Sequence, residues 1–159
     1  IVETTLTVGD KPNSAVVDYS GDVWVLSGGY TEYDANWNVV SETAGSLVKI
    51  ENNVVVSSFT FPVGNHPNNL IINDAGTTLY YSDGSWSTAV YSFNIDDNML
   101  PTVPLINRSF YSLGFNNNYI YGTDAVDYVQ QGWSYRYAVD GSVVDSVRTG
   151  IIPGGYCFN

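Results

Sequence analysis

The chain has very few basic residues. Lysine and arginine together number 5, against 16 aspartates and glutamates, which gives a formal net charge of −11. Such a surface does not neutralise phosphate groups and is repelled by anionic lipid headgroups, so we expect no nucleic-acid partner. Only 13% of the 159 residues carry a charge. The acidity is therefore read first as a source of solubility.

Cysteine and histidine are nearly absent as well, because Cys157 and His66 are the single examples of each. One cysteine cannot form an internal disulfide, and one of each residue excludes the commoner zinc sites from this chain. No phosphate-binding loop or dinucleotide fingerprint occurs. We therefore predict no metal site and no cofactor. No run is long and apolar enough to span a membrane. The chain begins Ile1-Val2-Glu3 without a signal peptide, so we expect it to be processed or trimmed.

Helical periodicity is absent, and short β-branched or aromatic segments separated by turn residues take its place. The chain contains 13 tyrosines and 4 tryptophans, residues that favour strands and amphipathic contact surfaces. Segments 23–26 and 79–81 are examples, each preceded by a glycine-containing turn. This pattern predicts an all-β fold.

One junction is repeated along the chain. Residues 8–13 read Val-Gly-Asp-Lys-Pro-Asn, and residues 63–68 read Val-Gly-Asn-His-Pro-Asn. Residues 150–153 give a third, partial copy. Each of the first two junctions is followed by an apolar strand, a glycine turn and an aromatic strand. A diverged unit, which lacks the junction, lies between the second and third copies. Each unit is predicted to contain four strands: 14–18, 22–27, 46–51 and 54–61; 69–73, 78–82, 89–95 and one near 103–106; 110–113, 119–123, 134–139 and 143–148.

Four antiparallel strands per repeat are typical of a β-propeller blade. We predict that residues 1–159 form a single partial propeller with about three blades, at 8–62, 63–108 and 109–149. Residues 1–7 match the last strand of a preceding blade, and residues 150–159 match the first strand of the closing blade. Three blades do not close a ring, so we expect the remaining blades to come from the same precursor or from a second chain. Symmetric pairing of copies is the alternative.

The connections between second and third strands are long and aromatic, and they share one predicted face with the repeated junctions. Loops that expose tryptophan and tyrosine on a rigid scaffold are typical binding sites. For any single aromatic residue, packing on its own blade is the alternative. The acids near this face match no cation-binding spacing, so solvated acids are the better reading. The predicted ligand-binding residues are Tyr30, Tyr33, Trp37, Asn65, His66, Asn68, Trp86, Asp124, Tyr128 and Trp133.

Catalysis has little support in the sequence, and no catalytic residue is predicted. The only histidine, His66, occupies a junction position that holds Lys11 and Ile152 in the other copies. No Gly-x-Ser-x-Gly elbow is present. A general base at a position that tolerates lysine and isoleucine is a weak hypothesis.

The repeats resemble those of the YncE-like propellers of Bacteroidetes, a family that also carries surface-layer and quinoprotein-dehydrogenase-like labels. The resemblance rests on Val-Gly-x-x-Pro-Asn followed by an apolar strand, a glycine turn and an aromatic strand. The C-terminal residues Gly150–Asn159, and Tyr135–Tyr137 before them, also resemble the C-terminal part of that family. The resemblance implies a seven-bladed propeller of which this chain is the C-terminal part. It also implies a lipoprotein anchored outside the outer membrane. One branch, the BtuG type, captures cobalamin (vitamin B12) and caps a TonB-dependent transporter, which implies a cobamide ligand and a transporter partner.

The sequence therefore leaves three functional hypotheses. A nutrient-capturing propeller predicts that Tyr30, Tyr33, Trp37, Trp86, Tyr128 and Trp133 surround one mouth. A protein-interaction scaffold predicts that they are spread over the surface. A lyase or lactonase requires a buried cluster of histidines or carboxylates, for which this chain offers little.

Overall fold

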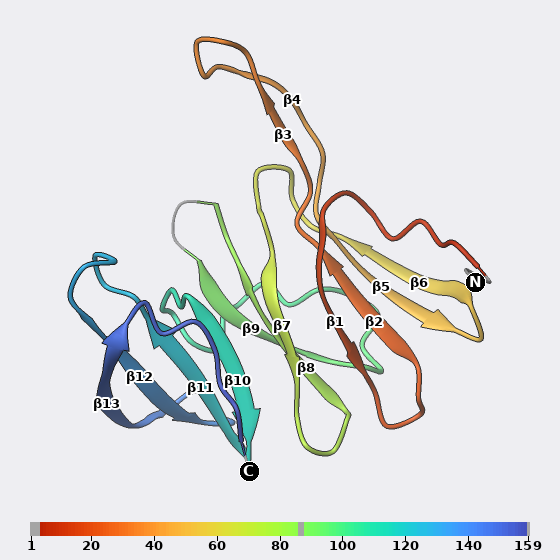
Figure 1. The fold of residues 1–159 in the computed structure, drawn as a ribbon. Helices are drawn as coiled ribbons and strands as arrows, with labels where there is room; N and C mark the ends of the chain where they lie inside the picture. Colours follow the sequence, from red (N-terminus) through yellow and green to blue (C-terminus); the bar gives the residue numbers. More distant parts are fainter. Residues whose placement is uncertain (1–3, 86–87, 159) are drawn as a thin grey trace.

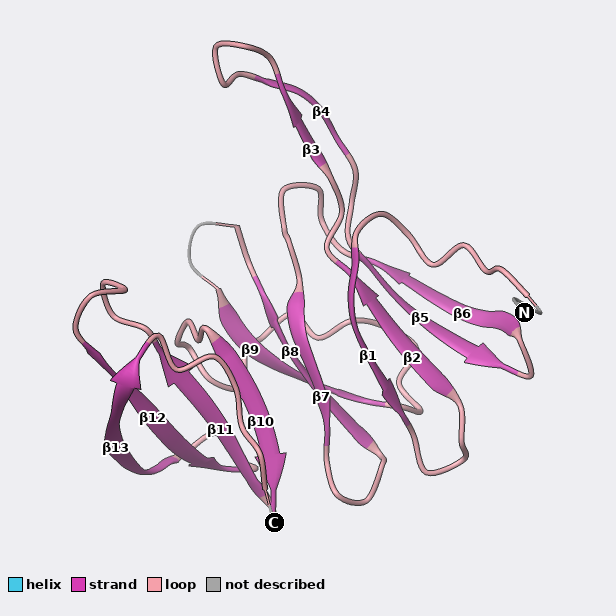
Figure 2. Ribbon diagram, viewed as in Figure 1, coloured by secondary structure: helices cyan, strands magenta, loops and turns pink. Residues whose placement is uncertain are grey.

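The computed structural model describes residues 4–85 and 88–158, and every regular element within them is a β-strand (Figures 1 and 2). Thirteen strands form four antiparallel sheets in these ranges, which confirms the prediction of an all-β fold. No helix in the same ranges meets the length and hydropathy required to cross a membrane.

The first sheet has four strands in the order β1 (Pro12–Val17), β2 (Val23–Ser27), β5 (Ser46–Glu51) and β6 (Val54–Thr60). All four overlap their predicted ranges. The turn between β5 and β6 consists of Asn52 and Asn53, with φ angles of 48° and 63°. Two consecutive residues with positive φ form the tight hairpin turn whose twist matches that of the strands, and asparagine tolerates this conformation.

The second sheet contains three strands, β7 (Asn68–Ile72), β8 (Thr78–Asp83) and β9 (Ala89–Asn94). The fourth strand predicted near residues 103–106 is wrong, since the chain there makes only a single bridge, between Ile106 and Val90. Pro101 and Pro104 lie in this segment. Because proline has no N–H to donate, the segment cannot continue a hydrogen-bonded ladder.

The third sheet again has four strands, β10 (Ser112–Asn116), β11 (Tyr119–Asp124), β12 (Gln131–Ala138) and β13 (Val143–Ile151). Its first strand starts two residues later than predicted. Phe110 is buried instead, with its ring against Gly122, where an added Cβ would lie 2.4 Å from the ring.

The fourth sheet is a hairpin of β3 (Thr31–Tyr33) and β4 (Val39–Glu42). It lies within the 28–45 connection, which the sequence analysis interpreted as a loop. Figure 1 shows the hairpin projecting away from the three larger sheets.

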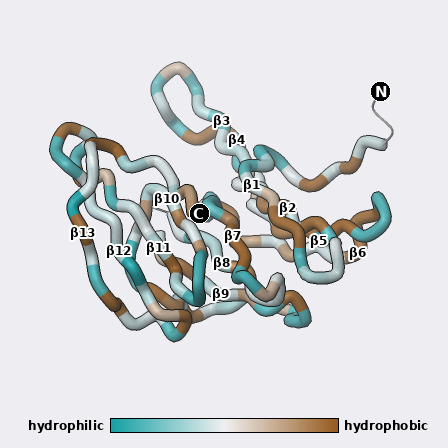
Figure 3. The backbone as a smooth tube through the Cα atoms, turned by 60° about the horizontal axis from the view of Figure 1, so that its bottom comes forward, coloured by the Kyte–Doolittle hydropathy of each residue, from teal (hydrophilic) through white to brown (hydrophobic). Residues whose placement is uncertain are grey.

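The three larger sheets pack against one another in chain order, and their first strands are neighbours: β1 contacts β7, and β7 contacts β10. Two hydrophobic cores fill the spaces between them. The first core contains Trp24, Leu26, Leu47, Phe61, Leu70, Leu79, Tyr81, Phe93 and Ile95. The second contains Tyr80, Val90, Ile106, Phe110, Leu113, Ile120 and Tyr137. The hydrophobic stretches of β2 and β7 are brown in Figure 3.

The middle sheet is buried on both faces. Leu79 and Tyr81 of β8 belong to the first core, and Tyr80, between them in sequence, belongs to the second. Successive side chains of a strand point to opposite faces, so a strand buried on both sides is apolar without alternation. This explains why Leu79, Tyr80 and Tyr81 follow one another in β8 without a small polar residue between them.

Residues 152–158 form no strand and lie across the outer face of the third sheet, beside β10 (Figure 1). The Tyr156 ring rests on Gly114, where an added Cβ would approach it to 2.8 Å. The Tyr156 hydroxyl hydrogen-bonds with that of Ser134 at 2.8 Å. At the other end, the Val8 carbonyl accepts hydrogen bonds from the hydroxyls of Ser27 and Ser46.

Candidate functional site

The repeated junctions adopt an unusual backbone. Lys11 and Ile152, which precede the prolines of the first and third copies, have φ angles of 51° and 50°. A positive φ is rare for a residue other than glycine, and rarer still for a β-branched one. The two junctions thus share this backbone angle as well as their sequence pattern. His66, in the second copy, does not share the positive φ.

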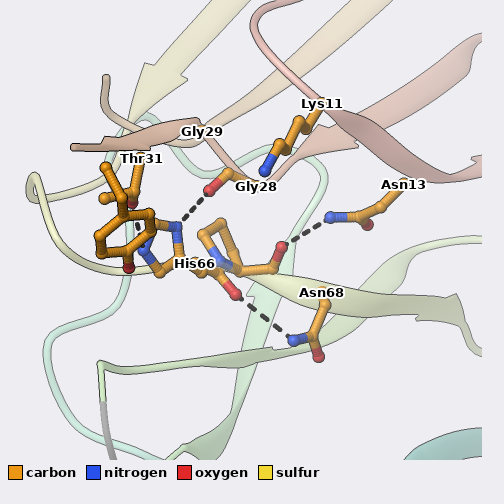
Figure 4. A pocket seen from close by; sticks show the side chains of 9 residues that line it. Lys11, Asn13, Gly28, Gly29, Thr31, His66 and Asn68 are labelled. Carbon is orange, nitrogen blue, oxygen red and sulfur yellow. Dashed lines mark hydrogen bonds between the residues drawn. The ribbon is translucent and has the colours of Figure 1, made fainter. Parts of the chain in front are cut away.

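The first two junctions border a cleft between the first and second sheets, with a volume of about 370 Å³. We call it the junction cleft (Figure 4). Three of the predicted ligand-binding residues, Tyr33, His66 and Asn68, lie in it together. Its lining consists of Lys11, Asn13, Gly28, Gly29, Thr31, Tyr33, His66, Pro67 and Asn68.

Hydrogen bonds between the two sheets fix the walls of the junction cleft (Figure 4). The Asn13 amide donates to the Pro67 carbonyl at 2.8 Å, and Nδ1 of His66 donates to the Gly28 carbonyl at 2.9 Å. The Asn68 amide donates to the His66 carbonyl at 3.3 Å. These bonds make the cleft a preformed feature of the fold, which lowers the entropy cost of binding.

The His66 ring is hydrogen-bonded through one nitrogen and faces a carboxylate with the other. A carbonyl oxygen can only accept, so the bond to Gly28 places a proton on Nδ1. Nε2 lies 3.3 Å from the Thr31 hydroxyl and 3.4 Å from Oε1 of Glu42. The Thr31 hydroxyl donates to Glu42 at 2.9 Å, so its proton is already directed away from the histidine. His66 thus joins the two sheets and the β3–β4 hairpin.

The lining of the junction cleft includes a lysine, Lys11, in a chain of strongly negative charge. Nζ of Lys11 lies 4.6 Å from the centroid of the Tyr30 ring, a cation–π contact that brings a fourth predicted residue to the rim. Gly29, whose N–H donates to the Asp10 carbonyl beside Lys11 at 3.0 Å, has a φ of 72°, and an added Cβ there would lie 2.4 Å from the Thr43 carbonyl oxygen. Lysine, amide side chains and the half-exposed Tyr33 ring suit a ligand with acceptor oxygens and a flat apolar surface.

Among the other predicted residues that the structure describes, Trp37, Asn65, Asp124, Tyr128 and Trp133 do not line the junction cleft. Trp37 is at the tip of the β3–β4 hairpin, where its ring contacts Tyr33 at a centroid distance of 6.1 Å. Trp133 is in β12 and packs against Arg148, whose guanidinium carbon is 4.3 Å from the ring centroid. Trp86 lies outside the described residues.

Asp124 and Tyr128 belong to a separate hollow of about 210 Å³, shared with Tyr111. The Tyr128 and Tyr111 rings meet edge to face at 5.7 Å. The Asp124 carboxylate accepts a hydrogen bond from Arg108 at 3.1 Å. The Asp124 carboxylate is therefore paired with a basic side chain of the same chain.

Sequence reasoning missed Lys11, Asn13 and Thr31. The repeat itself carries the missing signal for two of them, because it aligns Lys11-Pro12-Asn13 with His66-Pro67-Asn68. Equivalent positions of adjacent units lie on the same edge of the structure. Selecting one copy should therefore have selected the other.

A scan of the chain against protein-family models and a search of curated proteins found no match. Within residues 4–85 and 88–158, no group of three or more His, Cys, Asp or Glu side chains is placed to hold a metal ion.

Proposed function

We propose that the chain is a section of a β-propeller that binds a ligand at its junction face without transforming it. Three features support the propeller. The larger sheets are antiparallel, they pack face to face in chain order, and their first strands are neighbours. Radially repeated sheets of this kind are propeller blades. The second sheet, with three strands and a bridge, is a reduced blade.

The junction cleft carries the ligand-binding proposal. Lys11, Asn13 and Asn68 supply hydrogen-bonding groups around it, and Tyr33 supplies an aromatic wall. The cleft is bounded by two repeats, so its shape depends on how the sheets pack and not on a single flexible loop. Concave sites with a few convergent polar groups are the usual places where small molecules bind.

For the ligand we propose a cobamide, on the basis of the resemblance to YncE-like propellers. A corrin ring is large and flat and carries amide arms, which suits an aromatic wall beside lysine and amide side chains. The position outside the outer membrane and the TonB-dependent transporter partner are proposed on that resemblance alone.

The test is calorimetric titration of the intact protein with cyanocobalamin. We expect one-to-one binding that is weakened by Lys11→Ala and by Tyr33→Ala. Tyr128→Ala, which removes a tyrosine from the separate hollow, is the matched control and should leave binding unchanged. Absence of binding at about 1 mM ligand would overturn the cobamide proposal. A Kd of about 1 mM corresponds to a binding free energy of only about −4 kcal/mol.

The β3–β4 hairpin favours a second function, that of a protein-interaction scaffold. Trp37 is 82% exposed, and Val39 and Val40 are 57% and 61% exposed. Trp37 also has a φ of 64°, a strained conformation for a bulky residue, which points to a functional constraint. Exposed tryptophans are frequent anchors of protein interfaces. In affinity capture with the intact protein, Trp37→Ala should abolish retention of a partner protein.

A further inference from the structure

A second cleft, of about 380 Å³, lies between the end of the first sheet and the middle sheet. We call it the Asp83 cleft. It shares no lining residue with the junction cleft. Its lining consists of Thr60, Phe61, Pro62, Asn65, Tyr81, Asp83, Tyr91, Leu100, Pro101 and Thr102.

Asp83, the last residue of β8, is only 8% exposed. Its Oδ2 accepts a hydrogen bond from the Asn65 amide at 3.0 Å. Its Oδ1 is fully buried and has no hydrogen-bond partner among the described residues. Buried polar atoms almost always have a partner, and leaving one without costs free energy. Because Asp83 also lines the cleft, a ligand bound there is within reach of this carboxylate.

The charge of this carboxylate is poorly compensated. Burial raises the pKa of Asp83 above its ordinary value, and the Asn65 amide, the nearby Gly84 N–H and the charge of His66 offset that rise only in part. The Gly84 N–H acts on the pKa without forming a hydrogen bond of good geometry. No lysine or arginine lines the cleft. A cation inside it would supply the missing compensation.

The walls of the Asp83 cleft are aromatic. The Phe61 and Tyr81 rings meet edge to face at 5.4 Å, and the Tyr81 and Tyr91 rings stack at 5.9 Å. Aromatic faces attract cations and cover the apolar part of an organic one. A bare metal ion would need several oxygen ligands, and among residues 4–85 and 88–158 Asp83 is the one carboxylate that lines this cleft.

We propose that the Asp83 cleft binds an organic ammonium ion. The ammonium group donates a hydrogen bond to the Asp83 carboxylate, and its carbon skeleton lies against Phe61, Tyr81 and Tyr91. This site does not depend on the ligand proposed for the junction cleft, because the two clefts have different linings and opposite charge preferences.

The test compares three probes of nearly the same shape by calorimetry on the intact protein: benzylammonium, benzyl alcohol and benzoate. We expect benzylammonium to bind about tenfold or more tightly than benzyl alcohol, because a hydrogen bond between two charged groups is the stronger kind. Benzoate should not bind. Equal binding of benzylammonium and benzyl alcohol would overturn the proposal, and this comparison needs no variant.

Asp83→Asn provides the second arm, with the exposed Asp96→Asn as a control for the loss of one negative charge. Asp83→Asn should reduce benzylammonium binding to the level of benzyl alcohol and leave the melting temperature unchanged or higher, because it removes a poorly compensated buried charge. Asp96→Asn should change neither. Full retention of benzylammonium binding in Asp83→Asn would refute the assignment. A lowered melting temperature would instead identify Asp83 as a structural group.

Discussion

Replacing Asp18 with alanine should destabilise the protein more than the loss of any other single carboxylate in a turn. The Asp18 side chain is fully buried at the turn between β1 and β2. Its Oδ1 accepts the N–H groups of Ser20 and Asp22 at 2.9 and 3.0 Å. Its Oδ2 accepts the indole N–H of Trp24 at 3.0 Å, and Nζ of Lys49 lies 4.0 Å away. One carboxylate thus closes the turn and satisfies the largest side chain of the first core.

The magnitude follows from the three donors that alanine would leave behind. The Trp24 N–H is buried and has no other acceptor in the described structure, so losing its partner costs about 1–3 kcal/mol. The two turn N–H groups lose bonds to a charged acceptor but can reach water, which adds about 1 kcal/mol. We expect a total of about 3 kcal/mol, which lowers the melting temperature by about 6–12 °C in a chain of this size.

The assay is urea unfolding followed by tryptophan fluorescence, with Asp140→Ala as the control. Asp140 accepts the backbone N–H of Ser142 at 2.9 Å in a similar turn, but it is exposed, so its replacement should cost much less. If Asp18→Ala and Asp140→Ala lowered the free energy of unfolding equally, the burial argument would be refuted.

Three further outcomes are expected. Gly76→Ala should destabilise the fold by about 1–3 kcal/mol more than Gly21→Ala. Both glycines have positive φ, but an added Cβ meets neighbouring backbone, at 2.6 Å, only at Gly76. Equal melting temperatures of the two variants would refute this. Gly114→Ala should displace the Tyr156 ring and speed proteolysis of the C-terminal segment, seen as truncation by mass spectrometry, with no change if the contact is unimportant. Burial tends to raise the pKa of Asp18, but its hydrogen bonds and Lys49 outweigh that effect and hold the pKa below its ordinary value. Its stabilisation is therefore present above about pH 4 and is lost as the pH falls below that value, so the stability gap between the wild type and Asp18→Ala should narrow in acid.

Much of the strand pattern could be predicted because it depends on local chemistry. Asn52-Asn53 and Asn117-Asn118 both adopt the positive φ angles of tight hairpin turns, and asparagine pairs indicate such turns directly. The β3–β4 hairpin was not predicted, since its strands are short and mostly exposed and lack the alternation that burial imposes.

The candidate sites were predictable only in part. The repeat drew attention to His66 and Asn68, and Tyr33 followed from its position in a long aromatic loop. The separation of Trp133 and Tyr128 from them was not predictable, because it depends on where β12 begins and on a contact with Arg148. The acids near the predicted binding face were interpreted as solvated, but Asp83 is buried, with Asn65 donating a hydrogen bond to it. The 100–102 segment, which is distant in sequence, lines the same cleft.

The two-faced burial of β8 has a consequence for how the protein opens. Tyr80 and Tyr81 are adjacent in sequence but anchor different cores, so detaching either outer sheet exposes one face of the middle sheet and removes its support. Free-energy changes at one inter-sheet boundary are thus transmitted to the other through the middle sheet. Repeat proteins are often described by nearest-neighbour coupling. Here the coupling unit is the middle sheet, and the amides of its central strand β8 should be the last to exchange with solvent, after those of the edge strand β13.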